Sequence, residues 1–510
     1  MTIHLKKPAR DIAFALTLSA ALCAQGHAET LRAAAAAVPP TLGNPYSASG
    51  LPATELWTAI FDTLVRLDWL GGPQPGLALS WSNPDSLTWV FKLRPGVVFH
   101  NGRPVTASAI VKVIDYLRSP EAVSFLVSRE VNNVAGANAL DDLTLELKLS
   151  QPDAIFPKRI SLVMIVDAEA WAEKGADAFA LNPIGSGPYR LVNWGNGNVS
   201  PELAAFAQSW RAPQAFDRLL FRAVPEKSSR VQSLLSGQLD VISGLGFDDI
   251  AEIESAGFLA QRQKTTQVNS IALPNVRDGK HPLKDVRVRQ ALNYAVDKQA
   301  IATTILGGDV NIASQGAVPG IPGYNASLKP YPYDPARARA LLAEAGYPNG
   351  FALAIEIMVM FMPLDAVMYQ RVAQDLRAVG VEATVRSIPY ADFIRKYTTN
   401  QWGNVDAFAM GWNNSSYQDS ARALEYFSCL RTNPFFCDID TAALLKTAIE
   451  TPDQGARELK LQDVAARLYE LAPAIWLVNA TYVNAARPDI TNFRMRPTGI
   501  PFEELGVKKN

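Results

Sequence analysis

Apolar residues at every second position mark short strands in the first third of the chain. In the run LTWVFKLR, Trp89, Phe91 and Leu93 share one side, which is the period of a half-buried strand. A second such run, LTLELKLS, covers residues 143–150. Between them, Pro95-Gly96 and Asn101-Gly102 are typical turn dipeptides, and the second one favours a hairpin. The region from 61 to 183 is therefore predicted to alternate strands with helices.

Helical patterns become more frequent in the second half of the chain. The run that begins at Asp285 has Val288, Leu292 and Ala295 on one stripe, and Asp285 can cap its first turn. The stretch YDPARARALLAEAGYPNGF contains a cap at Asp334, a proline at the first helical position and a glycine stop. Mixed strands and helices of this kind predict an α/β protein with sheets flanked by helices.

Length and charge limit the class of protein. A chain of 510 residues has material for two or three domains, and 48 Lys+Arg nearly balance 49 Asp+Glu. Basic runs do not exceed KK, so we predict neither a nucleic-acid surface nor an anionic-membrane surface.

The N-terminus has the pattern of an export signal. A basic segment is followed by the apolar run IAFALTLSAALCA, and GHA supplies small residues before a cleavage site after Ala28. Leu22 stands before Cys23 where a lipoprotein needs a small residue, so a lipid anchor is not expected. We predict a signal peptide over 1–28 and a mature, soluble periplasmic protein of a Gram-negative bacterium.

The sequence lacks the familiar motifs of catalysis and metal binding. After cleavage His100 and His281 remain, far apart in the sequence, and neither a zinc-protease motif nor a nucleophile elbow nor a phosphate loop is present. We predict a protein that is no enzyme and has no cofactor and no metal ligands. Cys429 and Cys437 are expected to form a disulfide in an oxidising compartment, although two free thiols are the alternative.

Several segments, in order, carry a family resemblance. They are LALSWSNPDSLTWVFKLRPGVVFHNGRPVTA, NPIGSGPYRL, SRVQSLLSGQLDV, HPLKDVRVRQALNYAVDKQAI and YPYDPARARALLAEAGYPNGF. Together they resemble the periplasmic solute-binding proteins of ABC importers, in the oligopeptide/dipeptide/nickel-binding family (family 5). One departure is Ala109, which stands where the family usually has an acidic residue that completes a capping box with Thr106.

The resemblance implies a two-lobed fold that closes on its ligand like a hinged trap, with an extra domain. By analogy, domain I would comprise 29–55, 184–270 and 486–510, domain II 56–183, and domain III 271–485. The ligand would lie between domains I and III. The implied partners are the transmembrane subunits of an ABC permease and a small-molecule or peptide-like ligand, and we expect a monomer.

The same resemblance points to a recognition segment, DAFAMGWNNSSYQDS. Peptide-binding members hold the ligand's ammonium with an Asp shortly after a Trp, and here that position falls on Ser415 or Ser416. We expect Trp412 to form an apolar wall, with hydrogen bonds from the neighbouring polar residues Asn413, Asn414, Ser415 and Tyr417. Neutral groups suit sugars, amides, blocked peptides or a chelated metal better than free-amine peptides. The alternative is that NNSS is an ordinary loop.

Three functions follow as hypotheses. The first is the receptor of an ABC importer for a peptide-like or other polar organic solute. The second is a receptor for a metal–chelator complex of the nickel type. The terminal IPFEEL supports it, because this segment resembles the nickel-binding branch of the family. The third belongs to another class, an exported chaperone or sensor that works without a transporter.

Overall fold

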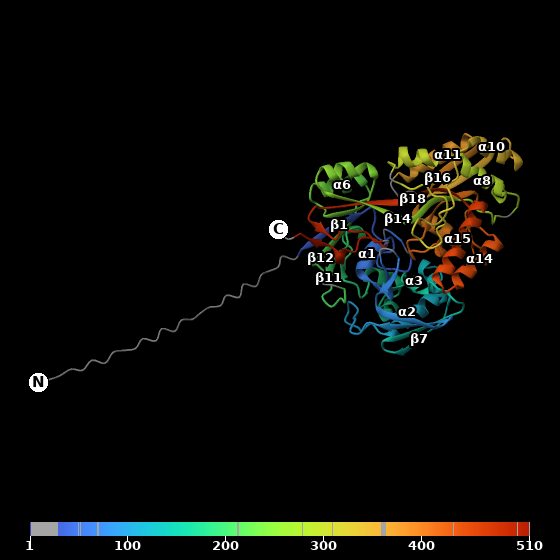
Figure 1. Ribbon diagram of the computed structural model, residues 1–510. Helices are drawn as coiled ribbons and strands as arrows, with labels where there is room; N and C mark the ends of the chain where they lie inside the picture. Colours follow the sequence, from blue (N-terminus) through green and yellow to red (C-terminus); the bar gives the residue numbers. More distant parts are fainter. Residues whose placement is uncertain are drawn as a thin grey trace.

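A computed structural model describes Met1 and residues 29–508, except 49, 52, 69–70, 212–213, 278, 309, 359–363, 432 and 497 (Figure 1). The predicted signal peptide, apart from Met1, lies outside these residues, as does the predicted cleavage position at Ala28. Within the described part of the chain, no helix combines the length and the apolar character that crossing a membrane requires.

A ten-stranded mixed sheet runs through the molecule and supports both lobes. Its strands, in spatial order, are β10 (Tyr189–Asn193), β11 (Glu202–Ala205), β12 (Arg218–Ala223), β1 (Thr30–Ala35), β13 (Val241–Leu245), β18 (Ala474–Ala486), β14 (Leu259–Ala272), β17 (Ala407–Asn413), β15 (Phe351–Ile357) and β16 (Val381–Ser387). Strand β1 pairs in parallel with β12 and β13, and β15 pairs in parallel with β16 and β17. The other strand pairs of this sheet are antiparallel.

The two longest strands, β14 and β18, connect the halves of this sheet (Figure 1). The first residues of β14 pair with the end of β18 beside the N-terminal lobe, and its last six residues pair with β17 of the C-terminal lobe. The register shifts between Lys264 and Val268, where the ladder is interrupted by an irregularity. Two crossing strands with such a break agree with the hinged two-lobe fold that the sequence led us to expect.

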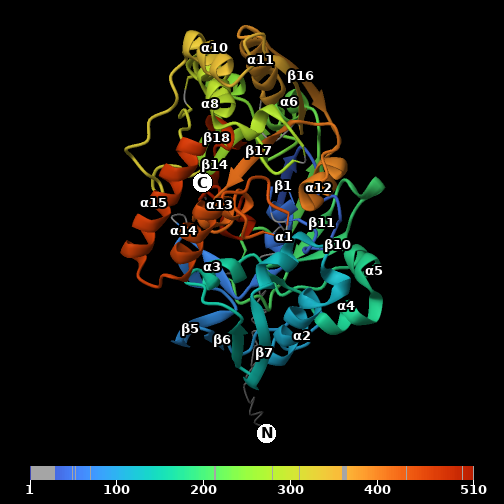
Figure 2. The ribbon, with the colours of Figure 1, turned by 90° about the vertical axis from the view of Figure 1, so that its right-hand side faces the viewer.

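A separate antiparallel sheet of four strands forms the extra domain (Figure 2). Its spatial order is β5 (Ala78–Asp85), β6 (Thr88–Leu93), β8 (Thr144–Leu149) and β7 (Val134–Asp141). Its helix α2 (Ala107–Arg118) is capped by Thr106, whose hydroxyl accepts a hydrogen bond from the Ala109 amide at 3.2 Å. Leu145, Leu147 and Leu149 are buried as predicted, whereas Leu143 is exposed because it precedes the strand.

His100 has a structural role at the edge of the extra domain. One ring nitrogen accepts from the Gly185 amide and the other lies 3.1 Å from the Gly187 carbonyl. Burial lowers the pKa of His100 to about 4, so the ring is neutral near neutral pH. This residue therefore joins the extra domain to the N-terminal lobe.

The remaining helices cover the sheets. In the N-terminal half they are α1 (Ala53–Ile60), α3 (Phe156–Ile160), α4 (Ala168–Lys174), α5 (Ala176–Leu181), α6 (Lys227–Leu235) and α7 (Ile250–Ser255). In the C-terminal lobe they are α8 (Val286–Ala295), α9 (Lys298–Ala300), a π-helical turn (Ile301–Ile305), α10 (Pro335–Glu344), α11 (Asp365–Arg377), α12 (Tyr390–Thr399), α13 (Ala421–Tyr426), α14 (Ile439–Glu450) and α15 (Gln454–Leu471). Asp285 and Asp334 cap α8 and α10 as predicted.

The buried apolar residues form separate clusters in the two lobes. One cluster is shared by the N-terminal lobe and the extra domain and contains Trp57, Phe91 and Phe156. Others fill the C-terminal lobe around Leu292 and around Trp412. The residue numbers proposed above for the three domain boundaries stay a prediction.

The burial of Glu55 leads us to predict that the stability of the protein depends on pH. Its side chain is buried on α1, accepts a hydrogen bond from Ser243 at 3.2 Å, and burial raises its pKa to about 7. The folded state therefore holds this proton more tightly than the unfolded chain. The stability it confers is complete below the unfolded pKa and is lost as the pH rises through about 7. Between pH 5 and 8 we expect the wild type to lose roughly 3 kcal/mol relative to Glu55→Gln, in urea unfolding. Parallel curves for the two proteins would contradict this.

Candidate functional site

A cleft lies between the two lobes beside the crossing strands. It consists of two adjoining cavities of about 110 and 140 Å³, which share Gly50, Leu51, Gln267, Asn413 and Tyr482. Gln267 and Tyr482 belong to β14 and β18, so the cleft sits at the hinge. We call this combined space the inner cleft.

One wall of the inner cleft comes from β17 and the loop that follows it. Asn413, Ser415 and Ser416 line this wall. The Asn413 side-chain oxygen accepts from the Ser415 amide at 2.9 Å, and the Ser415 hydroxyl oxygen accepts from the Thr266 hydroxyl at 3.0 Å. These predicted site residues are therefore brought together, and they present amide and hydroxyl groups to the cleft.

Trp412 lies on the other side of β17, in contrast to the wall position that the sequence led us to expect. Its side chain is 0 % exposed, stacks on Phe427 with ring centroids 3.8 Å apart, and donates a hydrogen bond to the Ser270 hydroxyl. The reason is strand alternation: Gly411 and Asn413 face the cleft, so Trp412 faces the core. A ligand contact by Trp412 stays untested, and the structure gives this residue a packing role.

Asn414 and Tyr417 are also buried away from the inner cleft. The Asn414 amide donates to the Gly316 carbonyl at 2.7 Å, which fixes the loop against its own lobe. The Tyr417 hydroxyl donates to Glu130 and accepts from Arg159, both in the extra domain. Tyr417 therefore joins the lobes rather than lining the inner cleft.

The opposite wall is rich in guanidinium groups that sequence reasoning did not single out. Arg211 pairs with Asp62 at 3.0 Å and with Glu503 at 2.6 Å. Arg66 makes looser contacts, 3.4 Å from Glu503. Burial and then the neighbouring Arg211 lower the pKa of Arg66. Of the residues on this wall, only Glu503 lies in a segment that the sequence analysis named, the terminal IPFEEL.

A larger cavity of about 850 Å³ lies between the extra domain and the C-terminal lobe. We call it the outer cavity. It shares Tyr397, Arg422 and Tyr426 with the inner cleft, so the two spaces meet at these side chains.

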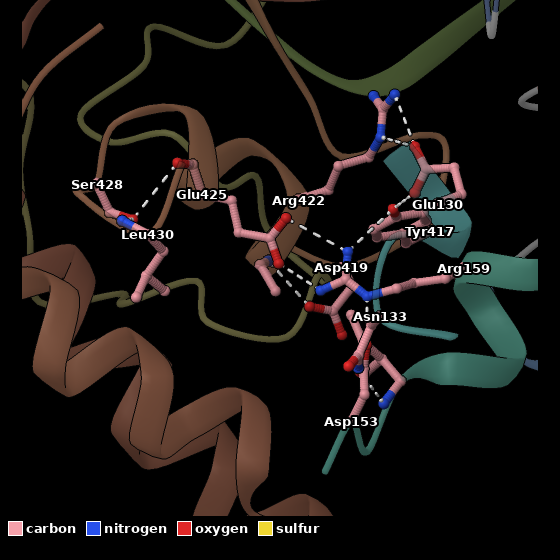
Figure 3. A network of polar contacts seen from close by, with 12 residues as sticks. Glu130, Asn133, Asp153, Arg159, Tyr417, Asp419, Arg422, Glu425, Ser428 and Leu430 are labelled. Atoms are coloured by element: carbon pink, nitrogen blue, oxygen red, sulfur yellow. Dashed lines mark hydrogen bonds and ion pairs between the residues drawn. The ribbon is translucent and has the colours of Figure 1, made fainter. Parts of the chain in front are cut away.

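A buried ionic network bridges the lobes beside the outer cavity (Figure 3). Arg159 of α3 contacts Asp153 at 2.5 Å and also binds Glu425 of α13. Glu130, in the extra domain, lies 3.4 Å from Arg422 of α13. The Arg159–Glu425 and Glu130–Arg422 pairs join the extra domain to the C-terminal lobe. The network therefore holds these two parts of the molecule together.

Cys429 and Cys437 are joined by a disulfide, with Cα atoms 4.8 Å apart. The bridge closes a short loop directly after α13, next to the outer cavity.

Comparison with known families adds the decisive observation. Residues 72–434 match the model of the bacterial extracellular solute-binding proteins, family 5. The chain belongs to this family. It is thus a solute-binding protein of an ABC importer that acts in the periplasm, in a family that binds solutes rather than transforming them.

Individual proteins of this kind align over most of their length. The glutathione-binding protein GsiB of Pectobacterium atrosepticum is 27% identical over 438 residues, 83% of each chain. The dipeptide-binding protein of Escherichia coli K12 is 26% identical over 509 residues, 92% of this chain and 91% of that one. The binding protein AgaA of A. tumefaciens R10, solved with agropinic acid, superposes with a TM-score of 0.84 at 23% identity, covering 94% of this chain and 99% of that one. The two-lobed fold is confirmed by this superposition.

Proposed function

We propose that this family 5 protein binds, in its inner cleft, a polar organic solute that carries an anionic group and needs no free ammonium. The observation that carries the proposal is the chemistry of the β17 wall. Asn413, Ser415 and Ser416 offer amide and hydroxyl groups there, where the family resemblance would put the carboxylate of peptide binders.

Charge on the opposite wall supports the same solute class. Among the described lining residues, the carboxylates are Asp62 and Glu503, and Arg211 is paired with both. A ligand ammonium would have to compete for them or stay unpaired, which costs several kcal/mol in a closed cleft. A ligand carboxylate could instead approach Arg66, whose contacts with Glu503 and Glu504 are 3.4 and 3.6 Å.

The names of the relatives agree with a solute that carries a carboxylate, whereas glutathione and dipeptides also carry a primary ammonium, which the proposed solute lacks. The relatives include binding proteins for glutathione and dipeptides, and one solved with agropinic acid. In this proposal the mature chain begins at Glu29 in a Gram-negative periplasm and works as a monomer. It closes on the solute and delivers it to the transmembrane subunits of an ABC permease.

Native mass spectrometry of protein purified without denaturation tests the proposal. We expect a retained organic solute with at least one carboxylate and without a primary amine. A retained metal chelate would favour the nickel-type alternative, and a retained free-amine peptide would overturn the solute class. A retained unfolded polypeptide would favour a chaperone.

Exchange of Ser415 for Asp provides the matching binding test. A carboxylate on this wall would have no cationic partner in the ligand and would repel its anionic group. We expect Ser415→Asp to weaken binding of the retained solute by about tenfold to hundredfold, from a penalty of roughly 1–3 kcal/mol. Titration calorimetry measures this, with Ser415→Asn as the neutral control of similar size. Tighter binding by the Asp variant would mean that the ligand carries an ammonium.

A further inference from the structure

The outer cavity holds more positive charge than its carboxylates neutralise. Its cationic lining residues are Arg129, Arg159, Arg422, Arg431 and Lys446, and its acidic ones are Glu130, Asp153, Glu425 and Glu450. Each of these carboxylates is already engaged. Glu130 faces Arg422, Asp153 and Glu425 both bind Arg159 (Figure 3), and Glu450 lies 3.8 Å from Lys446.

Arg431 stands apart from these pairs. Within the described part of the chain it has no carboxylate within ion-pair distance, and Glu425, the acidic group nearby, is held by Arg159. The Arg431 guanidinium instead lies over the ring of Tyr426, 3.6 Å from its centroid. Arg431 also forms a side-chain hydrogen bond with Tyr426. A guanidinium has five N–H groups, so those that Tyr426 does not use can bind an anion.

The surroundings fix Arg431 in this place. Tyr426 packs against Phe435 and Tyr397, with ring centroids 5.6 and 5.1 Å away. The disulfide between Cys429 and Cys437 closes the loop that carries Arg431. A guanidinium held by a rigid platform loses little conformational entropy when it binds, which favours a preformed site.

The electrostatic effect on Tyr426 supports an excess of positive charge. Burial raises the pKa of this phenol, but Arg431, Arg422 and Arg129 lower it, with a net decrease to about 8. Negative charge is therefore favoured at the junction of the outer cavity and the inner cleft, where Tyr426 and Arg422 line both spaces.

We propose that Arg431, with Arg422 beside it, forms an anion-binding subsite in the outer cavity that takes a carboxylate of the imported solute. The solute would extend from the inner cleft past Tyr397, Arg422 and Tyr426, so this inference rests on the proposed function. The subsite selects solutes with a second anionic group, at the end remote from Arg66.

Equilibrium dialysis of labelled succinate against the whole, ligand-free protein tests the subsite. Succinate supplies two carboxylates without the rest of the solute, and its diamide is the matched uncharged probe. We expect saturable binding of succinate and not of the diamide. Arg431→Met should weaken succinate binding by about tenfold or more, because a charge-assisted hydrogen bond is lost. Arg431→Lys should retain most of the binding.

Lys446→Met is the control, since this residue lines the same cavity but is paired and 56 % exposed. It should change succinate binding by less than about twofold. Absence of succinate binding, or equal losses in Arg431→Met and Lys446→Met, would overturn the subsite. Neither result depends on Ser415, so the subsite can fail while the proposed function stands.

A second measurement connects the subsite to transport. The solute retained by the wild type should bind Arg431→Met about tenfold more weakly as well, by calorimetry. Unchanged affinity of that solute, or a retained solute with a single anionic group, would overturn the assignment even if succinate binds.

Discussion

Replacement of Arg159 by methionine should open the lobes and weaken ligand binding by about a hundredfold. Arg159 is buried between Asp153 and Glu425, and its guanidinium also donates to the Tyr417 hydroxyl at 3.2 Å. Without it, two carboxylates would face each other in the closed interface with no cation. Breaking a buried ion pair in this way costs about 3–5 kcal/mol. Opening the interface relieves that cost because water can solvate Glu425, so the penalty falls on the closed state.

Small-angle scattering with and without the retained solute measures the opening, and calorimetry measures the affinity. We expect a larger radius of gyration for the ligand-free Arg159→Met protein than for the wild type. Arg337→Met is the control, because Arg337 pairs with Glu344 on an exposed helix and both side chains are about half exposed. Such surface pairs contribute about 0–1 kcal/mol. Identical scattering and affinity in wild type and Arg159→Met would show that the network does not hold the lobes together.

Truncation of Trp412 to alanine should lower the free energy of unfolding by about 3–5 kcal/mol, the range for large aromatic residues in cores. The indole is fully enclosed between Phe427 and Trp476, whose ring centroids lie 3.8 and 4.6 Å away. The hydrogen bond from its N–H to Ser270 is lost as well. Trp412 directly precedes Asn413, which lines the cleft. Loss of the indole should therefore disturb this wall, so ligand affinity should fall together with stability.

Urea unfolding of the ligand-free protein provides the measurement. Trp81→Ala is the control: Trp81 lies on β5 of the extra domain and is only partly buried, so its loss should cost clearly less. Trp412→Phe preserves stacking on Phe427 and should keep most of the affinity. A Trp412→Ala protein with unchanged stability and lowered affinity would instead support a direct ligand contact.

The local elements followed from the sequence because their signals are local. Thr106, Asp285 and Asp334 cap helices through contacts with residues two or three positions away, and a cap of this kind depends on nothing distant. In the extra domain, alternation marked β6 and β8, whereas the predicted Asn101-Gly102 turn lies beside an isolated bridge between Val98 and Pro104 and not in the four-stranded sheet. The family was identified from the order of such segments, and the family model agrees.

The candidate site was predicted only in part. Asn413 and Ser415 line the inner cleft, but Trp412 points into the core, because the face of a strand that meets a cavity depends on what packs against each side. Arg66 and Glu503 could not be found together in the sequence, since they are separated by most of the chain and meet only after the C-terminal segment returns to the N-terminal lobe.

By itself, then, the sequence determined the caps, turns and alternating strands, the class of fold and the family, all of which rest on neighbours in the chain. Only the tertiary structure decided which charges are paired. Arg159 meets Glu425 from across the lobes, whereas Arg431, six residues after Glu425, rests on an aromatic ring instead. Ion pairing in a buried interface depends on distance and desolvation in three dimensions, and neither quantity can be read from the order of residues.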